Sequence, residues 1–368
     1  SNKDIKYHLD NKRCVFDFTY GTCLGGVEQW CYSQADLIKK NGIDCVFLGP
    51  DISDSTRPEG LNYKYIRIES TKMNCEYYTA YCWIDEYVKN FLETEAGNIV
   101  INFPREIMIA AMCVKSIFHK NFNIIFVIHN DEEIYYDRYI EWKNGANSWL
   151  SISNKIEKRI LNSGISPDKI KRVQWKIQSE VRRKRSDLFH IGFAGRLTKQ
   201  KRVDMIISVA EILRQRGLRF LLEVAGKGEE EEVLTREINE RGLSSCVKYL
   251  GLIPHNEIKG FWVRQDVCLS CSDYEGHSIS IYEAMACGVV PVVTDVSGVK
   301  DDVTDGVNGF VVPVGDIERI VSRIEILYGD LLLLEKMSEC CFALVSKRND
   351  EINETLLWKE VLRSSNQY

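Results

Sequence analysis

Short runs of β-branched and other apolar residues alternate along this chain with longer amphipathic stretches, and this alternation limits its fold more than any other feature. The short runs predict buried strands, and the stretches between them predict helices that connect one strand to the next. Elements in this order form parallel sheets covered by helices. In the first half we expect strands at 14–18, 45–48, 98–102, 124–129 and 149–153, the last of them the final clear strand of that half, and helices at 27–40 and 155–161.

A change of composition separates this series from a second one. Residues 162–167 are rich in turn formers, and the residues after them are basic and polar. We therefore place a domain boundary within 172–187. Beyond it we expect strands at 188–193, 220–225, 247–250, 266–269, 288–293 and 309–312, and helices at 201–216, 229–241, 255–264 and 278–287.

Two α/β halves within 368 residues predict two domains, because a single core seldom grows beyond about 250–300 residues. We assign residues 1–172 to an N-terminal domain and 187–345 to a C-terminal domain. Each is expected to hold a Rossmann-like parallel sheet, and the two are expected to face a central cleft. Ligands of such sheets bind at the carboxyl ends of the strands.

The composition narrows the class of protein. A net charge of −5 argues against a nucleic-acid partner, and the basic run 182–185 is interpreted as a solvated linker. Thirteen cysteines, scattered and odd in number, predict free thiols in a reducing compartment. Cys268 and Cys271 form a C-x-x-C pair, which we interpret as core thiols because no second pair or histidine pair completes a zinc site.

The chain has no apolar stretch of the roughly 18–20 residues that span a bilayer, and its start lacks the basic-then-apolar pattern of a signal peptide. We therefore expect a cytoplasmic protein. Peripheral contact with the inner face of the membrane stays open.

Two strand–turn–helix segments are candidates for binding an anion. Gly25 and Gly26 precede the first helix, where glycines allow close backbone approach and the helix terminus favours negative charge, although a structural turn explains them equally well. In the second half, Gly195, Arg196 and Lys201 follow the first strand. A guanidinium, an ammonium and helix N–H groups together are suited to bind a diphosphate. The alternative interpretation is a solvated basic loop.

The segment from Glu275 to Glu283 is the most informative in the chain. Its two glutamates are eight residues apart and cannot share one helical face closely. We therefore place Glu275 in a loop and Glu283 early in a helix, with free N–H groups from Gly276 onward. An alternative stays open at this point, because Ser280 and Glu283 also fit a capping box in which Glu283 only reaches back to the helix start.

The order of the motifs in the second half resembles glycosyltransferase family 4. That order consists of Gly195-Arg196-Leu197 with Lys201, the glycines of 225–228, Leu250-Gly251, the Glu-x7-Glu segment followed by Ala284-Met285-Ala286, and 305–310. The resemblance covers most of the C-terminal half. It is looser in the N-terminal half, where it rests on Gly25-Gly26, on His129 after a strand and on Ser151–Ser153.

This resemblance implies a GT-B fold and a retaining glycosyltransferase that uses a nucleotide-sugar donor, a UDP- or GDP-sugar. The acceptor would be a glycan, a lipid-linked molecule or a small molecule in polysaccharide or glycoconjugate synthesis, bound by the N-terminal domain. The tail 346–368, around Trp358, resembles a final helix that crosses back to that domain.

The resemblance also implies a role for each candidate residue. Arg196 and Lys201 would hold the donor diphosphate. Glu275 and the backbone of Gly276, His277, Ser278 and Ile279 would orient the transferred sugar and the phosphate. Glu283 would accept from the ribose hydroxyls. Backbone near Ile253 would meet the base, Gly25 and Gly26 would approach the phosphate, and His129 would lie at the reaction centre.

Neither a metal nor another cofactor is expected, because the chain has no Asp-x-Asp diphosphate clamp. Arg196, Lys201 and helix N-termini would stabilise the leaving phosphate, which would help to deprotonate the acceptor on the same face. The chain departs from the family pattern at 172–177, where an Asn-Gly pair after Pro is usual, and at His277, where Phe is common.

Three other functions remain as alternatives. The first is a non-catalytic GT-B protein that acts as the partner of an active enzyme. The second is a UDP-sugar epimerase or a phosphorylase of the same fold. The third, a nicotinamide dehydrogenase, is disfavoured because the chain lacks G-x-G-x-x-G with its acidic partner.

Overall fold

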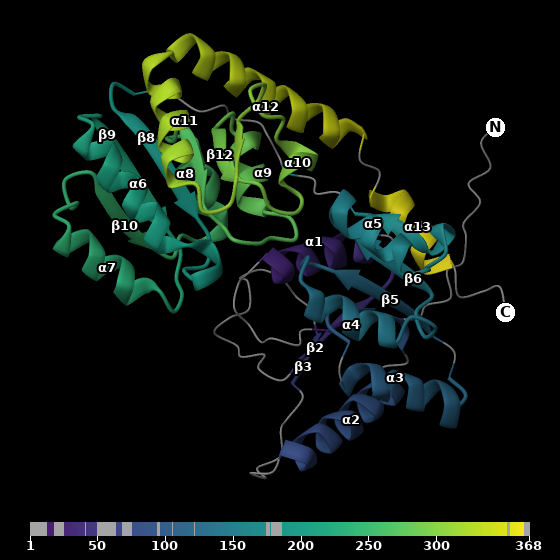
Figure 1. Cartoon of the computed structure of the whole chain (residues 1–368). Coiled ribbons are helices and arrows are strands. Elements are labelled where there is room, and N and C mark those ends of the chain that lie inside the picture. Colours follow the sequence, from purple (N-terminus) through teal and green to yellow (C-terminus); the bar gives the residue numbers. More distant parts are fainter. Residues whose placement is uncertain are drawn as a thin grey trace, which may run out of the picture. The chain divides into compact units, whose positions relative to one another are not determined.

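The chain forms two compact units in the computed structural model (Figure 1). The first unit contains 1–173 and 353–368, and the second contains 174–352. Within them, the structure describes residues 13–17, 26–40, 42–49, 64–67, 76–93, 96–104, 106–120, 122–173, 177, 186–351 and 354–363.

The first unit has one sheet, whose described strands run in the order β3-β2-β1-β4-β5-β6-β7, each parallel to its neighbour. The strands are β1 (Arg13–Asp17), β2 (Cys45–Gly49), β3 (Lys64–Arg67), β4 (Ala96–Ile101), β5 (Asn123–Ile128), β6 (Ser148–Ser151) and β7 (Ile170–Arg172). Every residue of β5 is buried, as expected of a strand covered on both faces.

The helices of this unit cover the sheet, and those that lie between two of its strands in the chain connect them. They are α1 (Gly26–Lys40), α2 (Glu76–Glu93), α3 (Glu106–Ile117), α4 (Glu133–Glu141), α5 (Asn154–Asn162) and α13 (Glu354–Arg363), with a 3₁₀ turn at Pro167–Lys169. At α5, the Ser153 hydroxyl accepts from the Ile156 N–H at 3.2 Å, which caps the helix start. Our expectation that 149–153 would form the last strand of this half was wrong, because Ile170–Arg172 pairs with β6 as a further edge strand.

The second unit repeats the design with six described strands in the order β10-β9-β8-β11-β12-β13, again all parallel. They are β8 (Phe189–Ala194), β9 (Phe220–Ala225), β10 (Val247–Gly251), β11 (Val267–Ser270), β12 (Val290–Thr294) and β13 (Phe310–Val312). The helices are α6 (Val203–Gln215), α7 (Glu231–Glu240), α8 (Ile258–Trp262), α9 (Ile279–Ala286), α10 (Val299–Asp302), α11 (Ile317–Gly329) and α12 (Leu331–Glu351), with 3₁₀ turns at Lys199–Lys201 and His255–Glu257.

Alternate residues of the central strands pack into two different cores, so the sheet lies between two layers of helices. Val267 and Leu269 of β11 pack with residues of α6, α7 and α11. Cys268, between them, packs with residues of α8 and α9. This arrangement is the doubly wound α/β fold that the alternation of elements predicts.

The last described helix, α13, belongs to the first unit although it follows the second in the chain. Trp358 is 1% exposed, lies 6.4 Å from both Phe16 and Trp30 between ring centroids, and donates its Nε1–H to Oε1 of Gln34 at 2.7 Å. Before it, α12 continues to Glu351, so the returning helix begins at Glu354 rather than near residue 346.

None of the helices in the described part of the chain is long and apolar enough to cross a membrane.

Candidate functional site

The strand order of the second sheet reverses between β8 and β11, which are hydrogen-bonded neighbours. At such a reversal the loops after the two strands leave in opposite directions and open a crevice at the carboxyl edge. The two loops here are 195–202, after β8, and 271–278, after β11. They hold most of the candidate residues in the C-terminal half, so the topology places these residues at one edge of one sheet.

Close backbone packing fixes the first of these loops. The Gly195 N–H donates to the Ala225 carbonyl at 3.0 Å, and the Leu197 N–H donates to the Lys227 carbonyl at 2.9 Å. Gly226 has a φ of +138°, and a Cβ there would lie 1.8 Å from the Gly195 carbonyl oxygen. Glycine is therefore required at 226, and the contact sets the path of the basic loop.

Lys201 and Glu275 meet between the two loops. The Lys201 ammonium forms an ion pair with Oε1 of Glu275, which also accepts from the Ser272 hydroxyl at 2.8 Å. Both side chains are nearly buried, at 13% and 9% exposed. Gln200 braces the same junction, because its carbonyl accepts from the Asp273 N–H at 3.0 Å and its amide donates to the Tyr274 carbonyl at 2.7 Å.

The helix α9 begins directly after this junction without a side-chain cap. Its N-cap is Ser278, whose side chain makes no capping hydrogen bond. Ser280 lies inside the first turn, so the capping box of Ser280 and Glu283 is not formed. Within the described structure no acceptor is assigned to the N–H groups of 279–281, which an α-helix leaves unpaired. The helix start therefore offers unpaired donors and the positive end of a dipole beside the Lys201–Glu275 pair.

Glu283 lies in the second turn of α9 and is half-buried. Burial raises its pKa to about 7, and an interaction with the neighbouring Trp262 side chain opposes the shift. Its carboxyl group therefore changes charge near neutral pH. Ile253, just after β10, is half-buried against the core, whereas Leu252 beside it is 54% exposed.

The two arginines of the basic loop differ in their surroundings. Arg202 is tied to Asp204 and Asp273, each at 3.0 Å, and takes a left-handed φ of 52° as the N-cap of α6. Arg196 is exposed, and within the described part of the chain its guanidinium is assigned no hydrogen bond or ion pair. Of these two guanidinium groups, Arg196 is therefore the one available for a ligand.

The His277 side chain points away from solvent and is only 7% exposed. Its Nε2 lies 3.3 Å from Oδ2 of Asp302, and Oδ1 of Asp302 is paired with the guanidinium of Arg348 on α12. The backbone of His277 remains within the loop between Glu275 and α9. His277 thus contributes its peptide group to the candidate site, whereas its imidazole is engaged behind the loop.

In the first unit, His129 follows β5 and is held in a defined tautomer. The Asn102 amide donates to the Asp17 carbonyl at 2.6 Å, which turns Oδ1 of Asn102 toward Nε2 of His129 at 2.8 Å. The His129 ring packs edge-on against Trp30, with centroids 5.0 Å apart. Burial lowers the pKa of His129 to about 3. The imidazole is therefore neutral at physiological pH, with Nε2–H as donor and Nδ1 as acceptor.

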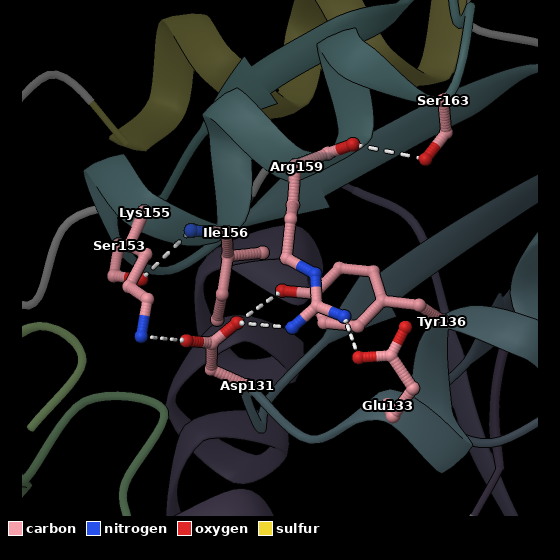
Figure 2. A network of polar contacts seen from close by, with 8 residues as sticks. All are labelled: Asp131, Glu133, Tyr136, Ser153, Lys155, Ile156, Arg159 and Ser163. Atoms are coloured by element: carbon pink, nitrogen blue, oxygen red, sulfur yellow. Dashed lines mark hydrogen bonds and ion pairs between the residues drawn. The ribbon is translucent and has the colours of Figure 1, made fainter.

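A buried carboxylate two residues later anchors the loop after β5 (Figure 2). Asp131, whose side chain is 2% exposed, accepts from the Tyr136 hydroxyl at 2.8 Å and pairs with Lys155 at 2.8 Å and Arg159 at 3.3 Å. The Arg159 guanidinium lies 3.9 Å from the centre of the Tyr136 ring and also pairs with Glu133. The network joins the loop after β5 to α4 and α5.

The candidates thus fall into two groups, one in each unit. The structure brings Lys201, Glu275 and the peptide groups of 276–279 together, with Glu283 one turn farther along α9. Gly25 lies outside the described residues, and Gly26 is the first residue of α1. Ser272, Asp302 and Asp131 were missed by the sequence analysis. Only Ser272 has a local signal, since it precedes Glu275 by three residues.

The second unit matches a known family. A family model described as glycosyl transferases group 1 matches residues 175–340. Curated relatives include the amylovoran biosynthesis glycosyltransferase AmsK of Erwinia amylovora, 30% identical over 47% of this chain and 45% of that protein. The capsular polysaccharide biosynthesis glycosyltransferase CapM of Staphylococcus aureus is 27% identical over 54% of this chain and 52% of that protein. The chain thus spans about half the length of these relatives.

Solved structures match nearly the whole chain. Sucrose-phosphate synthase from Thermosynechococcus elongatus has a TM-score of 0.80 at 14% identity, covering 96% of this chain and 98% of that one. Anabaena Alr3699/HepE in complex with UDP and glucose has a TM-score of 0.80 at 17% identity, covering 96% and 100%. By fold this chain is a GT-B protein with two Rossmann-like domains, and its residues 175–340 match the glycosyl transferases group 1.

Proposed function

We propose that this protein is a retaining glycosyltransferase that moves a sugar from a nucleotide-sugar donor to a glycan or lipid-linked acceptor in polysaccharide synthesis. The observation that carries the proposal is the meeting of Lys201 and Glu275 beside the uncapped start of α9, at the point where the strand order reverses. An anionic ligand there would find an ammonium group, unpaired N–H groups and a helix dipole within one crevice.

The same arrangement suggests how the donor would be held. Glu275 now neutralises Lys201, so a bound diphosphate would compete for the ammonium and leave the carboxylate to accept from sugar hydroxyls. Arg196, exposed at the same loop, would supply a forked donor. Glu283, one turn along α9, would accept from the ribose, and the backbone at Ile253 would meet the base. Gly25 and Gly26 are also proposed to approach the phosphate.

During transfer, the charge that develops on the leaving diphosphate would fall on Arg196, Lys201 and the start of α9. Donors fixed in place before the reaction stabilise such charge without reorganising. This set needs no metal, and we propose a metal-independent reaction. His129, neutral and with a fixed tautomer, would offer Nδ1 as a hydrogen-bond acceptor at the reaction centre.

The names of similar proteins support the donor and the setting. Alr3699/HepE was solved with UDP and glucose, and also with UDP-glucose. AmsK and CapM are named for the biosynthesis of the polysaccharide amylovoran and of capsular polysaccharide. These names favour a UDP-sugar as the first donor to try and a growing polysaccharide as the acceptor.

A donor panel tests the proposal directly. UDP-, GDP- and ADP-sugars are each added to the purified protein in EDTA, and thermal shift and release of the nucleotide are measured. We expect one class of nucleotide-sugar to raise the melting temperature and to be slowly hydrolysed without an acceptor, and NMR of the released sugar to show the donor's anomeric configuration first. Inversion of that configuration, or activity that depends fully on an added divalent metal, would contradict the mechanism.

The same panel separates the alternatives. A non-catalytic partner of the same fold would show no hydrolysis even where a nucleotide binds. An epimerase would convert the sugar of a UDP-sugar, or release a changed sugar, with no acceptor present. Wild-type protein that binds no nucleotide-sugar at all would overturn the proposed function.

A further inference from the structure

Next to the loop that precedes α9, three charged or polar side chains form a line that the proposed donor contacts do not use; two of them are buried and the third is partly exposed. It begins at His277, continues through Asp302 at the end of α10 and ends at Arg348 near the end of α12. Asp302 is 5% exposed, so its charge depends on the Arg348 guanidinium for compensation, with the His277 imidazole as its second polar neighbour. The Arg348 guanidinium also donates to the Asp301 carbonyl, which fixes it to the turn of α10.

Nε2 is the ring nitrogen of His277 that faces Asp302, and a proton on it would point toward a carboxylate oxygen that only accepts. Nδ1 of His277 is then free of that contact, and it has no hydrogen-bond partner among the residues that the structure describes. Gly298 packs directly on this side. A Cβ at 298 would lie 2.6 Å from the Gly276 carbonyl oxygen and 3.1 Å from Nδ1 of His277. The loop that precedes α9 is therefore supported on this side by the polar contact of His277 with Asp302 and by the backbone of Gly298.

The far end of the line is itself held firmly. Asn349, next to Arg348, bonds both backbone groups of Ile177: its Oδ1 accepts from the N–H at 3.2 Å, and its amide donates to the carbonyl at 2.5 Å. On the same helix, Cys341 and Val345 are completely buried. The part of α12 that carries Arg348 is thus a rigid support for Asp302.

We propose that Asp302 and Arg348 are positioning residues of the donor site, which act through His277 to hold the peptide groups of 276–278 in place for the donor. This inference rests on the proposed function, since it assigns those peptide groups to the donor's second phosphate and sugar. The residues touch no donor atom. Their effect is to fix the direction of the N–H groups beside Glu275, whose own side chain is set by Lys201 and Ser272.

The test compares two ligands, of which only one has the second phosphate and the sugar that this loop would bind. UDP-glucose requires the loop for its second phosphate and its sugar, whereas UMP carries only the base, the ribose and one phosphate. Calorimetric titration gives the Kd of each for the wild type and for His277→Ala, Asp302→Asn and Arg348→Gln; GDP-mannose and GMP serve if the wild type prefers guanine. We expect each variant to weaken UDP-glucose by about tenfold and to leave UMP nearly unchanged.

Two further variants show whether the line acts as described. His277→Gln places an amide N–H where Nε2 was and should recover most of the affinity for UDP-glucose. His277→Ala combined with Arg348→Gln should be little worse than His277→Ala alone, because both act through Asp302. Arg216→Gln is the matched control, since Arg216 pairs with Glu318 and Glu325 at the other end of α6, and it should change neither Kd.

The outcomes distinguish a failure of this inference from a failure of the proposed function on which it rests. Wild-type protein that binds neither nucleotide-sugar contradicts the proposed function. Wild-type protein that prefers UDP-glucose to UMP, with variants that keep the same preference, contradicts the positioning role alone. Variants that weaken both ligands equally while the melting temperature falls would show that the line only supports the fold, which also overturns the inference.

Discussion

At the scale of single residues, the Lys201–Glu275 pair joins two loops of the second unit, and we propose that it also binds the donor. Removing one charge leaves the other nearly buried and without its main partner, which destabilises the fold. We therefore expect Lys201→Met and Glu275→Gln each to lower the melting temperature and to reduce kcat/KM by about a hundredfold or more. The double variant removes both charges and should recover stability while staying inactive.

That separation of stability from activity is the purpose of the double variant. Melting temperature by scanning calorimetry and transfer by nucleotide release are measured on the same preparations. Lys201→Arg keeps a cation and serves as the conservative control. Wild-type turnover in either single variant would contradict the assignment of this pair to the donor site.

The raised pKa of Glu283 predicts how the binding of a nucleotide-sugar depends on pH. Burial raises its pKa to about 7 in the ligand-free protein, so it is largely protonated at about pH 6 and charged at about pH 8. A ribose hydroxyl binds the charged form more strongly. The affinity for UDP-glucose, whose phosphates do not titrate in this range, should therefore fall as the pH is lowered from about 8 to 6. Glu283→Gln should flatten this dependence.

The same pKa shift has a consequence for stability, with its sign fixed by linkage. A carboxyl group whose folded pKa is raised favours the folded state at low pH, and that contribution is lost as the pH rises from about 4.5 to 7. Without ligand, Glu283→Gln should therefore raise the melting temperature at about pH 8 and change it little at about pH 5. Equal melting temperatures of the two proteins at both pH values would mean that the Glu283 carboxylate is solvated.

At the scale of secondary-structure elements, the turn after β9 supports the basic loop by backbone contact alone. Gly226→Ala would drive a methyl group into the Gly195 carbonyl at a φ that L-residues rarely take. We expect a loss of at least about 2 kcal/mol in the free energy of unfolding, together with weaker nucleotide binding. Gly217→Ala is the control, since its φ is +81° but no heavy atom lies within 4 Å, and it should cost only about 1 kcal/mol. Denaturant titration of both variants gives the comparison.

The elements also show what a sequence can predict. Strands such as Phe220–Ala225 were placed within a residue or two, because a strand covered on both faces is mostly apolar, with the buried Glu223 as the exception here. The edge strand Ile170–Arg172 was missed because only Ile170 is buried, and its pairing with β6 defines it. The sequence of α12 shows no single apolar face that would indicate a helix. Its Leu334 and Met337 pack in one core, and its Cys341 and Val345 pack in the other.

The candidate site, too, was only partly predictable from the sequence. Glu275, Lys201 and the start of α9 were placed from local pattern and family resemblance, because loops at the carboxyl ends of parallel strands carry recognisable residues. The role of Ser280 as a cap was an open alternative that the helix start at Ile279 excludes. Partners distant in sequence, such as Asp302 for His277, depend on the packing of separate helices, and no local spacing indicates them.

At the scale of the whole molecule, the chain leaves the first unit at residue 173 and returns to it at 353, so the core of the first unit is completed only by the last helix. Trp358 is the main contribution of that helix, because it is buried against Phe16 and Trp30 and bonded to Gln34. Trp358→Ala should destabilise the first unit by about 3–5 kcal/mol. Leu356→Ala, at a side chain 50% exposed on the same helix, is the control and should cost far less.

The effect of Trp358→Ala should be confined to one unit, because the ring contacts and the hydrogen bond described for Trp358 lie in the first. Hydrogen exchange followed by mass spectrometry can measure this: peptides from β1 and α1 should lose protection, whereas peptides from β8 and β11 should keep it. Nucleotide binding, which we propose for the second unit, should survive, while transfer should fall if the first unit binds the acceptor as we propose. If protection were lost equally in both sheets, the two units would unfold as one, and our expectation that they are independently stable would be wrong.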